Sequence, residues 1–156
     1  MTSLVSRSSL SITWVPPDLA EEEWEFFHHP AKQEFFQRHG IDWPGLQAAF
    51  AEGRLVPYPR GEILAGVPVR LAYAGYDDYS RYLAKAKRGY RLNYNRLEEA
   101  LQRAGTLVVK APIVLGCEGE ALLFAGYRRL CLAWNYGMAP GVWLVPLAGG
   151  GDQHGD

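Results

Sequence analysis

An apolar run that passes directly into a second apolar pattern of a different period constrains the fold of this chain more than any other feature. Residues 120–125 read EALLFA, which has the length and composition of a buried strand. Residues 127–136 then follow a helical period, and one face of this helix carries Tyr127, Leu130, Ala133 and Trp134. Gly126 separates the two patterns. We therefore predict a buried strand followed at once by a helix that packs on the core.

The composition is that of an ordinary globular protein and gives no global preference for a charged partner. The chain has 156 residues, of which 48% are hydrophobic and 21% are charged, enough for one sizeable core. A net charge of -1 leaves any polyanion site to local clustering of basic residues. No apolar run is long enough to span a bilayer, and the first residues lack a signal-peptide pattern. We expect a cytoplasmic protein without membrane association.

The two cysteines, Cys117 and Cys131, form no CxxC pattern. Two thiols alone are too few ligands for a metal site, so we expect both to be reduced and structural. Neither a Walker loop, an HExxH motif nor a Ser-His-Asp set is present, which removes support for the familiar hydrolases. His39 precedes Gly40 at a predicted helix end, where a histidine usually interacts with the helix dipole.

The first third of the chain has the signals of three short helices. Asp18 is a predicted N-cap with Glu21 as its capping-box partner, Pro30 interrupts the helical pattern, and Gly40 ends it again. A third helix opens at Asp42 or Trp43. We therefore predict a helical N-terminal extension over residues 1–60. Its aromatic residues form either a core or a docking surface for a protein partner, and they are Trp24, Phe26, Phe27, Phe35, Phe36, Trp43 and Phe50.

The rest of the chain alternates between strand and helix signals. Pro57 and Pro59 predict a stiff connector, and the β-branched and aromatic residues of 63–76 predict a strand. Asn95 and Gly105 are the expected caps of an amphipathic helix. Further strands are expected within 106–116 and over 141–147. We predict one domain over 61–147 and a disordered tail over 148–156.

A basic segment, residues 79–97, contains no acidic residue although the whole chain is nearly neutral. Cations neutralise phosphates and tyrosines stack on bases, so the segment suits a nucleic acid or a nucleotide. The alternative is a solvated helical face with tyrosines packed beneath it. The predicted nucleic-acid contacts are Arg81, Lys85, Lys87, Arg88, Tyr90, Arg91 and Arg96.

The turn formed by residues 126–129, which we call the 126–129 turn, combines three features of an anion site. Gly126 allows close approach of the backbone, the first turn of a helix presents amide protons, and Arg128 and Arg129 add forked donors that match phosphate oxygens. Cations at a helix N-terminus are unfavourable unless an anion is close. The alternative is that the arginines pair with Glu118 or Glu120, or extend into solvent.

The order of motifs resembles that of the ParB/sulfiredoxin-like superfamily. The elements that carry the resemblance lie in sequence at the expected places, and the match covers about residues 65–147: Gly105, Pro112-Ile113-Val114, Gly126-Tyr127-Arg128-Arg129, Ala133, Gly137 and the closing strand at 142–145. The resemblance implies an α+β fold, with a small mixed sheet and packed helices, preceded by the helical extension.

The resemblance also implies a function. In that family the box binds nucleotide phosphates, so a nucleoside triphosphate (CTP or ATP) with Mg²⁺ is the implied cofactor, and Gly126, Tyr127, Arg128 and Arg129 are the implied contacts. Tyr127 stands where partition proteins have glutamate and sulfiredoxins have cysteine, which argues against sulfiredoxin chemistry. Neither the family's second nucleotide motif nor a helix-turn-helix domain follows the box. We therefore expect a DNA-associated, reduced relative of the kind found in phages or mobile elements.

Three classes of function stay open from the sequence. The first is a binding module for a nucleotide or DNA. The second is a nucleotide-dependent phosphotransferase or nuclease, in which Asp77 and Asp78 hold a metal or act as bases. Glu118 and Glu120 are the other candidate carboxylates, and an ordinary N-cap explains the aspartate pair equally. The third is a docking module without a ligand. The acidic residues at 18–25, here the acidic segment, could also cover the basic segment and mask it.

Overall fold

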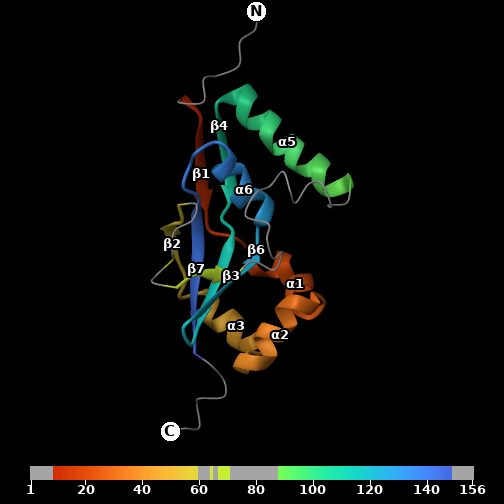
Figure 1. Cartoon of the computed structure of the whole chain (residues 1–156), viewed down its shortest axis with the longest axis vertical. Coiled ribbons are helices and arrows are strands. Elements are labelled where there is room, and N and C mark those ends of the chain that lie inside the picture. Colours follow the sequence, from red (N-terminus) through yellow and green to blue (C-terminus); the bar gives the residue numbers. More distant parts are fainter. Residues whose placement is uncertain (1–8, 60–63, 65–66, 71–87, 149–156) are drawn as a thin grey trace, which may run out of the picture.

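The computed structural model describes residues 9–59, 64, 67–70 and 88–148, and only the backbone of Arg70 and residues 88–93. It confirms a mixed α+β fold with two sheets (Figure 1). The larger sheet has the order β2-β7-β5-β6-β3 and is mixed, because β7 runs parallel to β5 whereas β6 runs antiparallel to it. Its strands are β2 (Arg54–Pro57), β3 (Val69–Arg70), β5 (Ile113–Cys117), β6 (Glu120–Ala125) and β7 (Gly141–Leu147). The smaller sheet pairs β1 (Ser11–Val15) with β4 (Thr106–Lys110) in parallel.

The described helices form two groups along the chain. The first group comprises the 3₁₀ helix η2 (Leu19–Glu22), α1 (Glu23–Phe27), α2 (Pro30–His39) and α3 (Trp43–Phe50). The second comprises α5 (Arg88–Ala104) and α6 (Tyr127–Asn135). Figure 1 shows α1, α2 and α3 gathered at one end of the larger sheet, while α5 extends away from the beginning of β4. In the part of the chain that is described, no helix has both the length and the apolar character needed to cross a bilayer.

The larger sheet has a helical layer on each face, because successive side chains of a strand point to opposite faces. On β5, Val114 belongs to the core that contains Leu101 of α5 and Leu130 of α6. Its neighbours Ile113 and Leu115 belong to the core that contains Phe35 of α2. Burial on both faces explains why the central strands read as continuous apolar runs.

Several predicted boundaries are confirmed and others are wrong. Asp18 caps η2 by accepting from the Ala20 amide at 3.0 Å, and Gly40 ends α2 in the left-handed conformation. Asn95 is not a cap: it lies inside α5, which begins at Arg88. The expected connector at Pro57 is the end of strand β2, and β1 was not predicted. Residues 148–156 are described only at residue 148, and of the strand expected over 63–76 only 64 and 67–70 are described.

Candidate functional sites

The 126–129 turn is a tight junction between β6 and α6. Gly126 has φ 99°, a left-handed conformation that L side chains rarely adopt, and it serves as the N-cap of α6. A Cβ atom at this position would lie 2.7 Å from the Cα of Pro112. The carbonyl of Gly126 accepts the first helical hydrogen bond from the amide of Leu130 at 3.0 Å. Glycine is therefore required here both by the backbone conformation and by the close approach of the segment between β4 and β5.

The two arginines of the turn have different surroundings from those expected. Arg129 donates from Nη1 to the backbone carbonyl of Lys110 at 2.7 Å, which fixes its guanidinium beside the end of β4. Burial lowers the pKa of Arg129; the nearby charge of Glu22 opposes this effect and that of Arg128 adds to it. Glu118 and Glu120, the acids suggested as partners for the arginines, instead contact His39 and Arg38.

The acidic segment lies against this junction. The carboxylate of Glu21 accepts hydrogen bonds from the Lys110 ammonium group at 2.8 Å. Glu25 pairs with Lys32, which is only 4% exposed and also donates to the carbonyl of Phe124 at 2.6 Å. Phe124 is one residue before the end of β6. These contacts place the acidic segment beside the ends of β4 and β6, the second of which leads into α6.

Glu22 is the carboxylate whose charge acts most directly on Arg129. Burial raises its pKa, the positive charge of Arg129 partly lowers it again, and Glu25 and Glu21 raise it. Glu22 and Arg129 are thus two partly dehydrated groups of opposite charge at the N-terminus of α6. Glu22 therefore supplies part of the negative charge that we expected beside the two arginines.

Most side chains of the basic segment are not described. Asp77, Asp78, Arg81, Lys85 and Lys87 lie outside the described residues. Arg88, Tyr90 and Arg91 belong to the first turns of α5 by their backbone, and their side chains are not described. Arg96 is exposed on α5. The predicted metal role of the two aspartates and the predicted nucleic-acid contacts of the segment therefore stay predictions.

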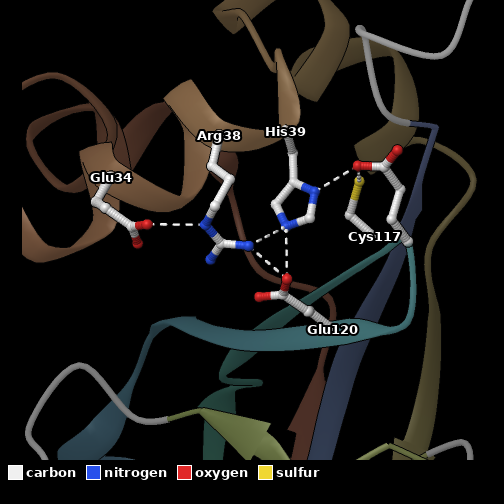
Figure 2. A network of polar contacts seen from close by, with 6 residues as sticks. Glu34, Arg38, His39, Cys117 and Glu120 are labelled. Carbon is white, nitrogen blue, oxygen red and sulfur yellow. Dashed lines mark hydrogen bonds and ion pairs between the residues drawn. The ribbon is translucent and has the colours of Figure 1, made fainter.

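A second cluster, which the sequence did not indicate, joins the end of α2 to the turn between β5 and β6 (Figure 2). We call it the His39 network, and its members are Glu34, Arg38, His39, Cys117, Glu118 and Glu120. The buried imidazole of His39 lies between two carboxylates, with Nδ1 2.5 Å from Glu118 Oε1 and Nε2 3.4 Å from Glu120 Oε2. Arg38 donates a hydrogen bond from Nε to Glu34 Oε2 at 2.8 Å and another from Nη1 to Glu120 Oε2.

The β5–β6 turn explains how the acidic members converge. Glu118 and Gly119 both have positive φ, 53° and 80°, which a two-residue hairpin turn requires. The turn directs Glu118 and Glu120 toward the C-terminus of α2. The hydrogen bond to Arg38 lowers the pKa of Glu120. No local pattern in the sequence indicates this network, because His39 and Glu118 are 79 positions apart.

The aromatic residues of the first helices divide into a core and an exposed surface. Phe35 and Phe36 are buried in the core beneath the sheet, whereas Trp24 is 57% and Phe27 is 45% exposed. Phe27 also lines a mainly apolar cavity of about 450 Å³. The other residues that line this cavity are Phe26, Gln33, Phe36, Gln37, Ile41, Asp42, Trp43 and Pro44.

Comparison with known proteins gave no match to a family model, to a curated protein or to a solved structure.

Proposed function

We propose that the chain is a phosphate-binding module whose anion binds at the N-terminus of α6. One observation carries the proposal: Arg129 is fixed by the Lys110 carbonyl, next to Arg128, in the first turn of a helix that no side chain caps. Both the positive end of the helix dipole and partial burial disfavour a cation there, and a bound anion relieves both costs. The resemblance to the ParB/sulfiredoxin-like superfamily supports the same location.

The ligand class follows from the same resemblance. A nucleoside triphosphate, CTP or ATP with Mg²⁺, would place its phosphates on the 126–129 turn, and DNA phosphates would extend along the basic segment. A phosphotransferase or nuclease would additionally need Asp77 or Asp78. Binding without turnover is the simpler proposal, because it requires only the side chains near α6.

The acidic segment acts in this proposal as an internal competitor. Glu22 supplies a negative charge beside Arg129, and burial raises the pKa of this carboxyl group, which means that its charged form is poorly solvated. An incoming phosphate would compete with the charge of Glu22 for Arg129. A Glu22→Gln variant, which keeps the shape and removes the charge, should therefore bind anions more tightly than the unmodified protein.

Isothermal titration calorimetry with pyrophosphate, CTP, ATP and a short DNA duplex, with and without Mg²⁺, tests the proposal. Hydrogen bonds to charged groups contribute about 1.5–3 kcal/mol each, so the Arg128→Ala, Arg129→Ala double variant should bind at least about 100-fold more weakly. Arg103→Ala, a change at an exposed position of α5, is the matched control and should bind normally.

Either of two results would contradict the proposal. Absence of binding to every one of these anions, or binding that survives the double arginine change in a folded protein, would exclude the 126–129 turn as the site. Circular dichroism of each variant establishes that it is folded. Phosphate release measured in the same samples separates binding from turnover.

The aromatic surface supports a second candidate function, docking of an apolar side chain from a protein partner. The exposed Phe27 and the cavity of about 450 Å³ beside it are the observation that favours it. An apolar fluorescent probe should bind the folded protein, and Phe27→Ser should abolish the binding while leaving the melting temperature within a few degrees. A probe that binds both proteins equally would exclude this surface.

A further inference from the structure

Three different kinds of metal-ligating side chain meet at the β5–β6 turn. His39 is the last residue of α2, Cys117 is the last residue of β5, and Glu118 is the first residue of the turn. One ligand atom from each lies within 4.8 Å of the other two. The Cys117 Sγ atom is 4.0 Å from Glu118 Oε1, and that oxygen is 2.5 Å from His39 Nδ1. These separations are close to those between the ligand atoms of one bound metal ion, and small side-chain movements would complete the match.

The chemistry of the donor set selects the class of metal. Magnesium and calcium prefer oxygen ligands alone, whereas sulfur together with imidazole nitrogen and carboxylate oxygen suits zinc. Zinc bonds of about 2.0–2.3 Å place neighbouring ligand atoms of a tetrahedron about 3.3–3.8 Å apart. Glu118 would have to move away from His39 by roughly 1 Å, and its side chain, which is 33% exposed, lies where such a movement is easy.

The second nitrogen of His39 has the surroundings of a zinc-ligating histidine. Histidine ligands commonly donate their other N–H to a carboxylate, which fixes the tautomer and the orientation of the ring. Here Nε2 lies 3.4 Å from Glu120 Oε2, and Arg38 holds that carboxylate from the other side. With a metal on Nδ1, the proton resides on Nε2 and is donated to Glu120. The guanidinium of Arg38, whose Nη1 atom is now 3.2 Å from Nε2, can only donate, so it would then keep only its carboxylate partners.

The charges around the cluster also favour a cation. The C-terminus of α2 presents the negative end of its dipole to His39. Glu118 and Glu120 add two carboxylates. Arg38 is an opposing charge, with Nη1 3.2 Å from His39 Nε2, and its guanidinium also contacts Glu34 and Glu120. The thiol of Cys117 and the ring of His39 are both buried, so two of the three ligands are preorganised by the core.

We infer that His39 Nδ1, Cys117 Sγ and Glu118 form a zinc site whose fourth position is open to water. The metal ties the end of α2 to the β5–β6 turn on the face of the sheet opposite α5 and α6. This site is independent of the 126–129 turn, because it shares no ligand with it.

Binding of zinc and cobalt to untagged, chelator-treated protein tests the inference. Equilibrium dialysis against Zn²⁺ should give one tightly bound ion per chain, and Co²⁺ should give the near-ultraviolet charge-transfer absorption of a cobalt–thiolate bond. Cys131 provides a matched control, since it is the other buried cysteine and lies in the core on the opposite face of the sheet. Cys117→Ser should lose the charge-transfer band and the tight ion, and Cys131→Ser should retain both.

Two glutamate variants separate ligand from supporting residue. Glu118→Gln should weaken zinc binding more than Glu120→Gln, which removes only the partner of Nε2 and should cost about 10–100-fold in affinity. Zinc should raise the melting temperature of the wild type and not that of Cys117→Ser. Absence of tight binding in the wild type, or equal binding in Cys117→Ser, overturns the inference.

Discussion

The ammonium group of Lys32 donates a hydrogen bond to the backbone carbonyl of Phe124, 2.6 Å away, where α2 packs against the end of β6. Lys32 is buried and its pKa is lowered by burial, while the charge and hydrogen bond of Glu25 oppose that shift. A buried lysine is maintained only when its charge and its donors are satisfied. This contact links the acidic segment, α2 and the strand that leads into the 126–129 turn.

Replacing Lys32 by methionine keeps most of the apolar stem of the side chain and removes its donors. The Phe124 carbonyl and the Glu25 carboxylate would then lose their partner, so the free energy of unfolding should fall by about 1–3 kcal/mol. Urea unfolding followed by circular dichroism measures the loss. The control is Lys110→Met, which breaks an exposed ion pair with Glu21 and should cost at most about 1 kcal/mol. Equal losses in both variants would show that burial of Lys32 is unimportant.

Changing Gly126 to alanine should destabilise the protein for two separate reasons. The left-handed conformation costs an L residue roughly 1–2 kcal/mol. The added Cβ would also meet Pro112 at 2.7 Å, and overpacking of this kind costs about 1–3 kcal/mol more. Gly137 has φ 72° with open space around it, so Gly137→Ala isolates the conformational cost. Thermal and urea unfolding should rank Gly126→Ala as clearly the less stable variant, and the opposite ranking would contradict the geometry.

Local sequence signals correctly predicted those helix ends that are set by a single capping residue. Gly40 ends α2 and Asp42 accepts from the Gly45 amide at 2.8 Å, because capping chemistry is contained in a few neighbouring residues. Gly126 at the strand–helix junction was found for the same reason. The order of strands and helices from residue 106 onward followed from apolar periodicity.

Features that depend on distant partners could not be predicted in this way. Pro57 indicated a connector, but β2 lies at the edge of the sheet, where a proline is tolerated. Asn95 matched the pattern of a cap, yet α5 continues on both sides of it because buried Tyr94 and Leu101 share one packed face. The electrostatic interaction of Glu22 with Arg129 and the convergence of the His39 network arise only after folding.

Tyr94 should make the protein sensitive to alkaline pH. Burial raises its pKa to about 12 from an ordinary value near 10, although the hydrogen bond from Asn135 at 3.0 Å partly opposes this. Between these values the folded state holds a proton that the unfolded state has lost, so stability is complete below pH 10 and falls as the pH rises toward 12.

A Tyr94→Phe variant has no such proton and should lose less stability over the same interval. Urea unfolding at several alkaline pH values measures the difference. Absorbance titration should also show one tyrosinate fewer near pH 12 in the variant. Parallel stability profiles for the two proteins would mean that Tyr94 ionises normally.

Phe35 tests whether α1, α2 and α3 unfold together with the sheet. Its side chain is 0% exposed and shares a core with Leu115 and Val145, so Phe35→Ala should lower the free energy of unfolding by roughly 3–5 kcal/mol. Phe27→Ala, at a half-exposed position, is the control and should cost much less. The indole of Trp143 on β7 donates to the Phe50 carbonyl of α3 at 3.1 Å. Trp43 packs against the same core, so two of the five tryptophans report on this interface. Fluorescence and circular dichroism should therefore shift to the same lower midpoint in Phe35→Ala; separate transitions would show that these helices and the sheet are independent folding units.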